Sequence, residues 1–346
     1  MSLAFSCKPT HDVLCVGHAS YDMVFSVPRH PLADEKIFAD DFLACGGGPA
    51  ANAAVIVARL GYQSAFAGYL GDDLYGESHF LELVREGVDT RCLVRGTEST
   101  PLSCVLVKPD GGRALVNYKG STRHLTEDCI DFSEINPKVV LFDGHEPLVS
   151  IPLAASARDK GIPLVLDAGS LHEGTKALMG KVDYLVASEK FALQWLEDFS
   201  KCLPPFAKGG QGGFSQWEEP GKSNSELALP DGEVENALAH LAGLASIVII
   251  TLGERGLIWR KEGISGAFPA FPIKPVDTTG AGDAFHGAFA AGIAAGLPWD
   301  ELLGYASAAG AYCCQRLGAR TGLASAGEIR DFLAVNPLCA IKSDAN

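Results

Sequence analysis

The chain has 346 residues, of which 47% are apolar, and its formal net charge is −14. This length suits one α/β core with an appendage, and the apolar share is enough for a large core. So acidic a chain, without an apolar run long enough to cross a bilayer, argues against nucleic acid and membranes as partners. Residues 1–13 lack the basic start and long apolar stretch of a secretory signal, so we expect a cytoplasmic protein.

The ten cysteines form no C-x-x-C pair, so a zinc site is poorly supported. Several lie in apolar contexts, such as VLCVG (13–17) and LSCVLV (102–107). Cysteines of this kind are usually buried as small hydrophobic residues. This usage suits a reducing compartment and predicts no disulfide.

The first predicted element is the strand VLCVG (13–17), which has Asp22 shortly after it. Two stretches, 21–45 and 99–122, have no helical pattern between their predicted strands, and the second contains a PDGG hairpin turn. We interpret them as a small antiparallel sheet that projects from the core. Above a phosphate site, such a sheet would act as a lid that excludes water. An ordinary meander on the sheet edge is the alternative.

Residues 46–61, GGGPAANAAVIVARLG, predict a helix that begins at Pro49 and ends just before Gly61. Gly47, Gly48 and their neighbour leave the backbone bare at the helix start, where a sugar hydroxyl or a phosphate could approach. Asn52 lies one turn into the helix, and its amide can both donate to and accept from a polyol.

The same glycines allow a rival interpretation. Gly46, Gly48 and Ala51 fit the dinucleotide pattern G-x-G-x-x-A, and Asp72 lies near the expected position of the ribose-binding acid. This pattern would indicate an NAD-dependent oxidoreductase, although it leaves the glycine motif near residue 280 unexplained.

The second half of the chain alternates short apolar runs with helical segments such as 151–161. Near-continuous apolar strands are buried on both faces, as in a parallel sheet. The strands are predicted within VVLFDG (139–144), PLVLDAG (163–169), YLVAS (184–188) and IVIITLG (247–253). We therefore predict a doubly wound α/β fold with a mostly parallel sheet. Ligands in such sheets bind beyond the carboxyl ends of the strands, where Asp143, Asp167 and Gly253 fall.

Residues 200–235 are rich in Gly, Pro, Ser and charge and have no periodicity, which predicts a flexible insertion. The tripeptide GKS (221–223) in this stretch is not a P-loop, because Gln216 stands where that motif needs a glycine and no strand precedes it.

The segment 277–289, DTTGAGDAFHGAF, is the most informative in the chain. Gly280, Ala281 and Gly282 precede a helical run, and the bare amides of a helix start form a pocket for an anion such as phosphate. A carboxylate beside a phosphate is electrostatically costly unless it has a task. For Asp283 the task would be to accept a proton from an attacking hydroxyl. The simpler alternative is a helix cap after a glycine-rich turn.

The two glycine motifs together, GGGPAANAAVIVARLG and VDTTGAGDAFHGAFAAG, resemble the pair of signatures of the ribokinase-type (PfkB) carbohydrate kinase family. Their order and their separation of roughly 230 residues also fit. The resemblance covers nearly all of the chain outside 200–235 and the tails. It implies a sugar kinase that uses ATP and Mg²⁺, with a ribokinase-like core formed by 10–20, 46–98 and 123–335 and a β lid formed by 21–45 and 99–122.

The resemblance also implies roles for individual residues. Asp283 would be the general base, and the amides of Gly280, Ala281 and Gly282 would form the anion hole. The sugar would be held by Asp22, Gly47, Gly48, Asn52 and, from the lid, Asn117. The nucleotide would lie at Thr251, Gly253 and Gly256, and a monovalent cation such as K⁺ at Asp277 and Thr279, completed by carbonyls of 313–318.

The sequence departs from the family pattern at several positions. Ser188-Glu189-Lys190-Phe191 stands in place of an Asn-x-x-Glu motif, so Glu189 would serve Mg²⁺ only through water. Pro49 stands where ribokinases carry a lysine, and GGGPAA and FHGA resemble the sulfofructose kinase branch. His145 lies where that branch favours an arginine. It is either a substrate-pocket donor or an ordinary surface histidine.

We expect a homodimer if the lid pairs across a two-fold axis. The partners would then be a small-molecule sugar and ATP, with no nucleic acid and no membrane. A non-catalytic sugar or nucleotide sensor with the same fold is a further alternative. The sequence does not identify the sugar.

Overall fold

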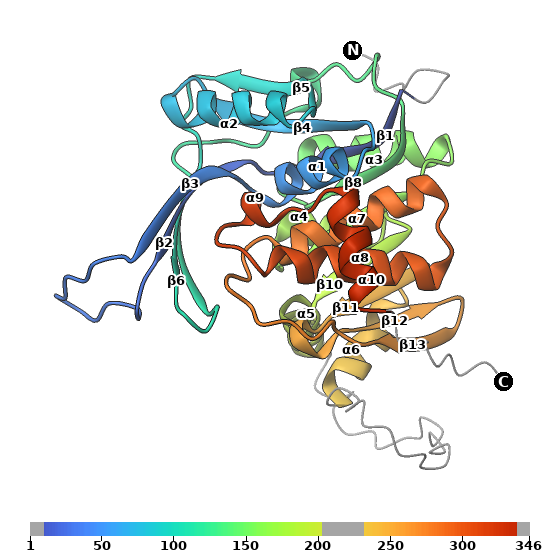
Figure 1. Cartoon of the computed structure of the whole chain (residues 1–346). Coiled ribbons are helices and arrows are strands. Elements are labelled where there is room, and N and C mark those ends of the chain that lie inside the picture. The colour runs from blue at the N-terminus through green and yellow to red at the C-terminus, as the bar shows by residue number, and fades with distance from the viewer. Residues whose placement is uncertain (1–9, 203–231, 338–346) are drawn as a thin grey trace, which may run out of the picture.

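A computed structural model describes residues 10–202 and 232–337 (Figure 1). Two sheets organise the chain, one of nine strands and one of four. The strands of the large sheet lie in the spatial order β13 (Ile264–Phe268), β12 (Leu257–Lys261), β11 (Ile247–Thr251), β10 (Tyr184–Ser188), β9 (Leu164–Ala168), β8 (Pro137–Phe142), β1 (His11–Val16), β4 (Ser64–Gly71) and β5 (Asp89–Gly96). All pairings from β11 to β5 are parallel, and only β12 and β13 run antiparallel. The predicted doubly wound, mostly parallel sheet is confirmed.

Helices cover both faces of the large sheet because its strands are apolar on both faces. In β1, Val13 and Cys15 join one apolar core and Leu14 and Val16 join the other. The first core contains α1 (Pro49–Arg59), α2 (Leu74–Arg85), α7 (Ala281–Ala295), α8 (Trp299–Cys313) and α10 (Ala326–Val335). The second contains α3 (Pro147–Asp159), α4 (Glu173–Leu178), α5 (Glu189–Cys202) and α6 (Gly232–Leu241). The short helix α9 (Ala319–Gly322) precedes α10.

The small sheet projects away from the large one (Figure 1). Its strands lie in the order β3 (Asp41–Gly47), β2 (Ser20–Ser26), β6 (Leu102–Val107) and β7 (Arg113–Tyr118). The outer pairs are antiparallel as predicted, and the PDGG hairpin joins β6 to β7. The central pair, β2 with β6, is parallel, so the sheet is mixed. Its own apolar core cluster is small and consists of Val24, Val105 and Val107.

The predicted bounds of the insertion, 200–235, overlap described helices at both ends. Residues 200–202 finish α5, and residues 232–235 begin α6. The remainder, with the GKS tripeptide at 221–223, lies outside the described residues. Within the described part of the chain, the helices are too short or too polar to cross a membrane.

Candidate active site

The glycine motif at the start of α7 has the geometry of an anion site. Gly280 precedes the helix with φ 78°, a left-handed conformation that favours glycine. A Cβ at this position would lie 2.4 Å from the Cβ of Ala319, so any side chain is also excluded by space. At the start of α7, Ala281 N has only a long contact of 3.4 Å to the Thr278 carbonyl oxygen, and the helix dipole adds positive potential there. Ala281 is partly exposed and Gly282 is exposed.

Asp283 is held from the first glycine motif. Asn52 Nδ2 donates to Asp283 Oδ2 at 2.7 Å, although the two residues are 231 positions apart in the sequence. The contact depends on a close crossing of α1 and α7, since a Cβ on Gly287 would lie 2.7 Å from the Ala53 carbonyl oxygen. Asn52 is 2% exposed, and its Oδ1 has no partner among the described residues. A buried amide oxygen without a partner is costly unless a ligand hydroxyl reaches it.

Asp22 lies against the glycine loop from the small sheet. Its carboxylate accepts from Ser20 Oγ at 2.8 Å, and a Cβ on Gly47 would lie 2.2 Å from Asp22 Oδ2. Gly48 has φ 93°, and a Cβ there would meet the His18 carbonyl oxygen at 2.6 Å. Burial raises the pKa of Asp22, and the nearby charge of Asp283 raises it further. The structure thus brings Asp22, Asn52 and Asp283 into one electrostatic neighbourhood.

The dinucleotide interpretation does not fit this loop. Residues 46–48 end β3, which pairs antiparallel with β2 in the small sheet. The fingerprint needs a strand of the parallel sheet directly before the helix. Asp72 has a 59% exposed side chain and lies 3.6 Å from Arg95 Nε, so this carboxylate has a simpler role in a surface ion pair.

Asp143 is a buried residue of the candidate site, and the sequence indicated nothing of its contacts beyond its place at a strand end. Its side chain accepts from the backbone amides of His18 (2.7 Å), Ala50 (3.2 Å) and His145 (2.8 Å). It therefore fastens the ends of β1 and β8 to the start of α1. A Cβ on Gly17 would overlap this carboxylate at 1.9 Å, which explains the glycine there.

A buried pair, Asp167 and His286, lies behind the anion loop. Asp167 Oδ2 is 3.3 Å from His286 Nδ1, which also lies 2.6 Å from the Gly282 carbonyl oxygen. His286 Nε2 faces the Val186 carbonyl oxygen at 3.2 Å, so both ring nitrogens face acceptors. Burial raises the pKa of Asp167 to about 6.

The predicted cation loop is assembled around Asp277. Its Oδ1 accepts from Thr279 N at 2.8 Å and Thr279 Oγ1 at 2.6 Å, and its Oδ2 accepts from Gly318 N at 2.8 Å. Cys313 Sγ lies 3.5 Å from the Thr279 carbonyl oxygen. Asp277 is fully buried and joins the loop before α7 to residues 313–318, which the family resemblance had grouped with it.

The predicted nucleotide residues lie at the end of β11. Thr251 Oγ1 donates to the Ala187 carbonyl oxygen at 3.3 Å. Gly253 and Gly256 have φ 63° and 87°, and a Cβ on Gly256 would lie 2.1 Å from the Phe268 carbonyl oxygen. Glu189, the first residue of α5, forms an ion pair with Arg255, which lies between Gly253 and Gly256.

The small sheet reaches the anion loop through its hairpin. Thr278 Oγ1 lies 3.5 Å from the Gly111 carbonyl oxygen, and a Cβ on Gly111 would lie 3.3 Å from Pro275 Cβ. Asn117 is exposed on β7 opposite Ser103. His145 is half-buried at the end of β8, with its ring 4.6 Å from that of His172 between centroids.

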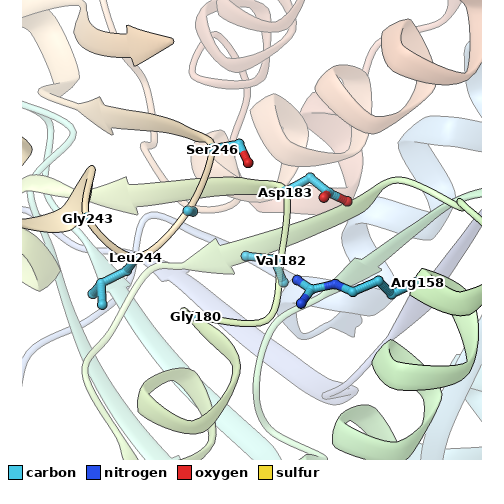
Figure 2. A pocket seen from close by; sticks show the side chains of 8 residues that line it. Arg158, Gly180, Val182, Asp183, Gly243, Leu244 and Ser246 are labelled. Carbon is cyan, nitrogen blue, oxygen red and sulfur yellow. The ribbon is translucent and has the colours of Figure 1, made fainter. Parts of the chain in front are cut away.

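A pocket elsewhere in the fold (Figure 2) shares no lining residue with these motifs. It is lined by Arg158, Gly180, Val182, Asp183, Gly243, Leu244, Ala245 and Ser246. Asp183 and Ser246 directly precede β10 and β11, so this pocket lies at the amino ends of the strands. Ligands of open parallel sheets bind at the carboxyl ends, where the two glycine motifs meet.

Comparisons with known proteins agree with this architecture. Ribokinase of Bacillus subtilis is 25% identical over 327 residues, which cover 93% of this chain and 99% of the relative. Fructokinase-2 of Zea mays is 28% identical over 339 residues, covering 93% and 94%. The structure of Arabidopsis thaliana ribokinase complexed with ribose and ATP has a TM-score of 0.71 and 23% identity, covering 93% of this chain and 98% of that one.

Residues 10–326 match the family described as pfkB family carbohydrate kinase. The match spans both glycine motifs, both sheets and almost every element of the described fold. The chain therefore belongs to the pfkB family of carbohydrate kinases.

Proposed function

We propose that this sugar kinase transfers the γ-phosphoryl group of ATP to a sugar hydroxyl, with Asp283 as the general base. The observation that carries the proposal is the contact of Asn52 Nδ2 with Asp283 Oδ2 at 2.7 Å, at the first turn of α7. This contact brings together Asn52, which can bind a polyol, Asp283, which can accept a proton, and the glycine loop at 280–282, which can bind an anion. Among the described residues, Asp283 Oδ1 has no hydrogen bond and stays available to the hydroxyl.

In this mechanism the sugar hydroxyl is oriented between Asp283 and the glycine loop. Asp283 takes the hydroxyl proton as the oxygen attacks phosphorus in line. The amides of Gly280, Ala281 and Gly282 meet the charge on the moving phosphoryl group, assisted by the dipole of α7. Asp22 anchors the far side of the sugar, because it is buried against Gly47.

The remaining contacts of the sugar come from both sheets. The bare backbone of Gly47 and Gly48 lets a hydroxyl approach closely, and Asn52 Oδ1 offers an acceptor. Asn117 would reach the sugar from the lid and His145 from the end of β8. The lid contact of Gly111 with Thr278 supports this closure, since it ties the hairpin to the anion loop.

The nucleotide would lie over the end of β11, at Thr251, Gly253 and Gly256. A ribokinase of the same fold is described as complexed with ribose and ATP, which supports ATP as the donor. Mg²⁺ neutralises phosphate charge when it is bound. Glu189 suits it only through water, because its carboxylate pairs with Arg255. For K⁺, the carbonyls around 279 and 313–318 are the better ligands, since both oxygens of Asp277 already accept hydrogen bonds.

The small sheet would also carry a homodimer contact. Its edge strands are β3 and β7, and apolar side chains on them are exposed, with Phe42 54%, Val116 71% and Tyr118 57% accessible. Exposed apolar residues on an edge strand favour pairing with another chain. Light scattering should give a dimer for the wild type and monomer for Val116→Lys. A monomeric wild type would remove this part of the proposal.

The function is tested by ADP release from ATP against ketoses, aldoses, nucleosides and sulfonated sugars. We expect at least one sugar to give ADP release that is lost in Asp283→Asn. Thermal-shift measurements with ATP and with NAD separate the kinase from the oxidoreductase, because the ligand that binds the folded state raises Tm. Stabilisation by sugar without ADP release on any of them would instead indicate a sensor and overturn the proposal.

A further inference from the structure

A buried arginine joins α9 to α2. Arg320 is the second residue of α9 and is 3% exposed. Its Nη2 donates to His79 Nε2 at 3.1 Å, and its Nε lies 3.4 Å from Glu82 Oε1. His79 and Glu82 lie about one turn apart on α2 and therefore face the same side. A guanidinium keeps its charge when it is buried, so these two partners carry most of its interactions.

The first partner of Arg320 leads to the glycine loop at residues 46–48. Glu82 Oε2 accepts from Gly46 N at 2.7 Å. A Cβ on Gly46 would lie 2.9 Å from Arg320 Nη2 and 2.3 Å from His79 Cδ2, so the loop lies directly against these side chains. The lack of a side chain at Gly46 is what allows the backbone to come this close.

The second partner leads to Asp22, which we propose as an anchor of the sugar. Arg320 can only donate, so His79 Nε2 accepts and the ring is neutral. Burial, and then the charge of Arg320, lower the pKa of His79, which agrees with a neutral ring. The same ring interacts with the backbone of Ser20, whose Oγ donates to Asp22 Oδ1 at 2.8 Å. Arg320 is thus linked to Asp22 through His79 and Ser20.

The neighbours of Arg320 in α9 contact the anion loop. A Cβ on Gly280 would lie 2.4 Å from Ala319 Cβ. Arg59 Nη1 donates to the carbonyl oxygen of Arg320 at 2.9 Å and to that of Leu323 at 2.6 Å, which holds α9 in place. Consecutive residues of one short helix therefore touch the anion loop and carry the guanidinium that reaches the sugar side.

This network is an expensive way to stabilise a fold. Arg320 Nη1 has no hydrogen bond among the described residues. A buried charge with incomplete hydrogen bonding costs free energy, and apolar side chains of similar volume often stabilise a fold as well or better. The arginine is therefore better explained by what it positions than by its contribution to stability.

The charge of Arg320 also acts on Asp22. Burial has the largest effect on the pKa of Asp22 and raises it. The charge of Asp283 raises this pKa further, whereas that of Arg320 lowers it. Without the arginine, Asp22 would keep its proton to a higher pH and accept fewer hydrogen bonds from a sugar. Other titratable groups around Asp22, Arg320 and the two partners of Arg320 include His18, Tyr21, Cys45, Arg59 and Glu86.

We propose that Arg320 is a positioning residue for sugar binding, which holds Asp22 and the glycine loop at 46–48 in place relative to the anion loop. The inference rests on the proposed sugar-kinase function and adds a residue that acts through His79 and Glu82. Its effect falls on the sugar, because both partners lead to the sugar side, whereas the proposed nucleotide residues lie at the end of β11.

The test separates the KM for the sugar from the KM for ATP, using ADP release with the sugar that gives the highest kcat/KM. In Arg320→Gln, the KM for the sugar should rise at least about tenfold, while the KM for ATP and kcat change by less than about threefold. Arg330→Gln, at an exposed position on α10, removes the same charge and should keep all three constants. An unchanged KM for the sugar, or an equal rise in both KM values, would overturn the inference.

A double variant covers the case in which Arg320→Gln does not fold. Arg320→Met/Glu82→Gln removes both buried charges together, and the new amide oxygen at position 82 can still accept from Gly46 N. The double variant should fold and show a similar rise in the KM for the sugar, of about tenfold or more. A folded double variant with the wild-type KM for the sugar counts against the role of Arg320.

The pH dependence of kcat/KM for the sugar is a readout that a purely structural role would leave unmoved. Loss of the Arg320 charge should shift the acid limb to higher pH, because Asp22 then keeps its proton longer. Arg320→Lys retains the charge and should keep the limb near its wild-type position. An acid limb that stays in place in Arg320→Gln contradicts the effect on Asp22.

Hydrogen exchange gives a readout that does not depend on catalysis. The amides of β2 and β3 should exchange faster in Arg320→Gln than in the wild type, with those of α7 unchanged. Faster exchange in the variant, without ADP release by the wild type on any sugar, overturns the proposed phosphoryl transfer and retains the hold of Arg320 on the loop. ADP release by the wild type, with exchange and KM unchanged in the variant, overturns the role of Arg320 and leaves the kinase intact.

Discussion

The replacement Asp283→Asn separates the chemistry of this residue from its structural contacts. The amide of Asn is nearly isosteric with the carboxylate, and its oxygen can still accept from Asn52 Nδ2, now at 2.7 Å from Asp283 Oδ2. The variant therefore keeps the contact between α1 and α7. It loses the ability to take a proton from the sugar hydroxyl.

The structure sets the magnitude of two opposite effects on stability. Removing a negative charge from the first turn of α7 costs about 0.3–1 kcal/mol of helix-dipole stabilisation. Relief of repulsion acts the other way, since the Asp283 charge raises the pKa of both Asp22 and Asp167. The net shift in Tm should be no more than about 3 °C. Loss of a general base lowers turnover by about 100- to 10,000-fold.

The assay is ADP release at saturating ATP and sugar, with Tm and ATP binding measured on the same preparations. We expect ATP to stabilise the variant as it does the wild type while turnover falls by at least about 100-fold. Asp331→Asn, at an exposed position on α10, is the matched control and should keep full turnover. A folded Asp283→Asn with turnover within about tenfold of the wild type would refute the assignment of the base.

Three further predictions concern the surroundings of this residue. In Asn52→Asp, a second carboxylate would lie beside Asp283 at the contact now made at 2.7 Å, and repulsion between the two charges should raise the pKa of Asp283. The acid limb of the pH–rate profile should therefore move to higher pH. A limb that does not move argues against the contact. In Gly287→Ala, the new methyl meets Ile56 Cγ2 at 2.4 Å and should cost about 1–3 kcal/mol in urea unfolding, whereas Gly180→Ala, facing open space, should be neutral. The raised pKa of Glu146 means that its ionisation opposes folding, so the wild type should lose stability relative to Glu146→Gln as the pH rises from about 4.5 to about 7. Parallel urea curves for these two proteins across that window would contradict the burial of a protonated carboxyl.

Local sequence was sufficient to predict the position of the two helices that follow glycine motifs. Pro49 at the start of α1 and Gly280 before α7 have conformational reasons that act within a few residues, so both helices could be placed in advance. The apolar runs of β8 to β11 likewise predicted a sheet covered on both faces, because each run is short and without a polar side.

Contacts that depend on strand order could not be predicted in this way. The parallel pairing of β2 with β6 joins segments about 80 residues apart, and nothing near either strand specifies it. The triple contact of Asp143 and the pairing of Asp167 with His286 need the sequence of strands β1, β8 and β9 across the sheet. The ion pair of Glu189 with Arg255 appears only once β10 and β11 lie side by side.

The composition of the small sheet affects how often this part of the protein opens. Because its apolar core cluster consists of only Val24, Val105 and Val107, the sheet has too little apolar interior to be stable alone and depends on its contacts with the rest of the protein. It should open far more often than the nine-stranded sheet, and the exposed connection at residues 28–40 should be the first point that a protease cuts. Anything that fastens the hairpin down would slow that cleavage, which makes digestion rate a simple reporter of occupancy.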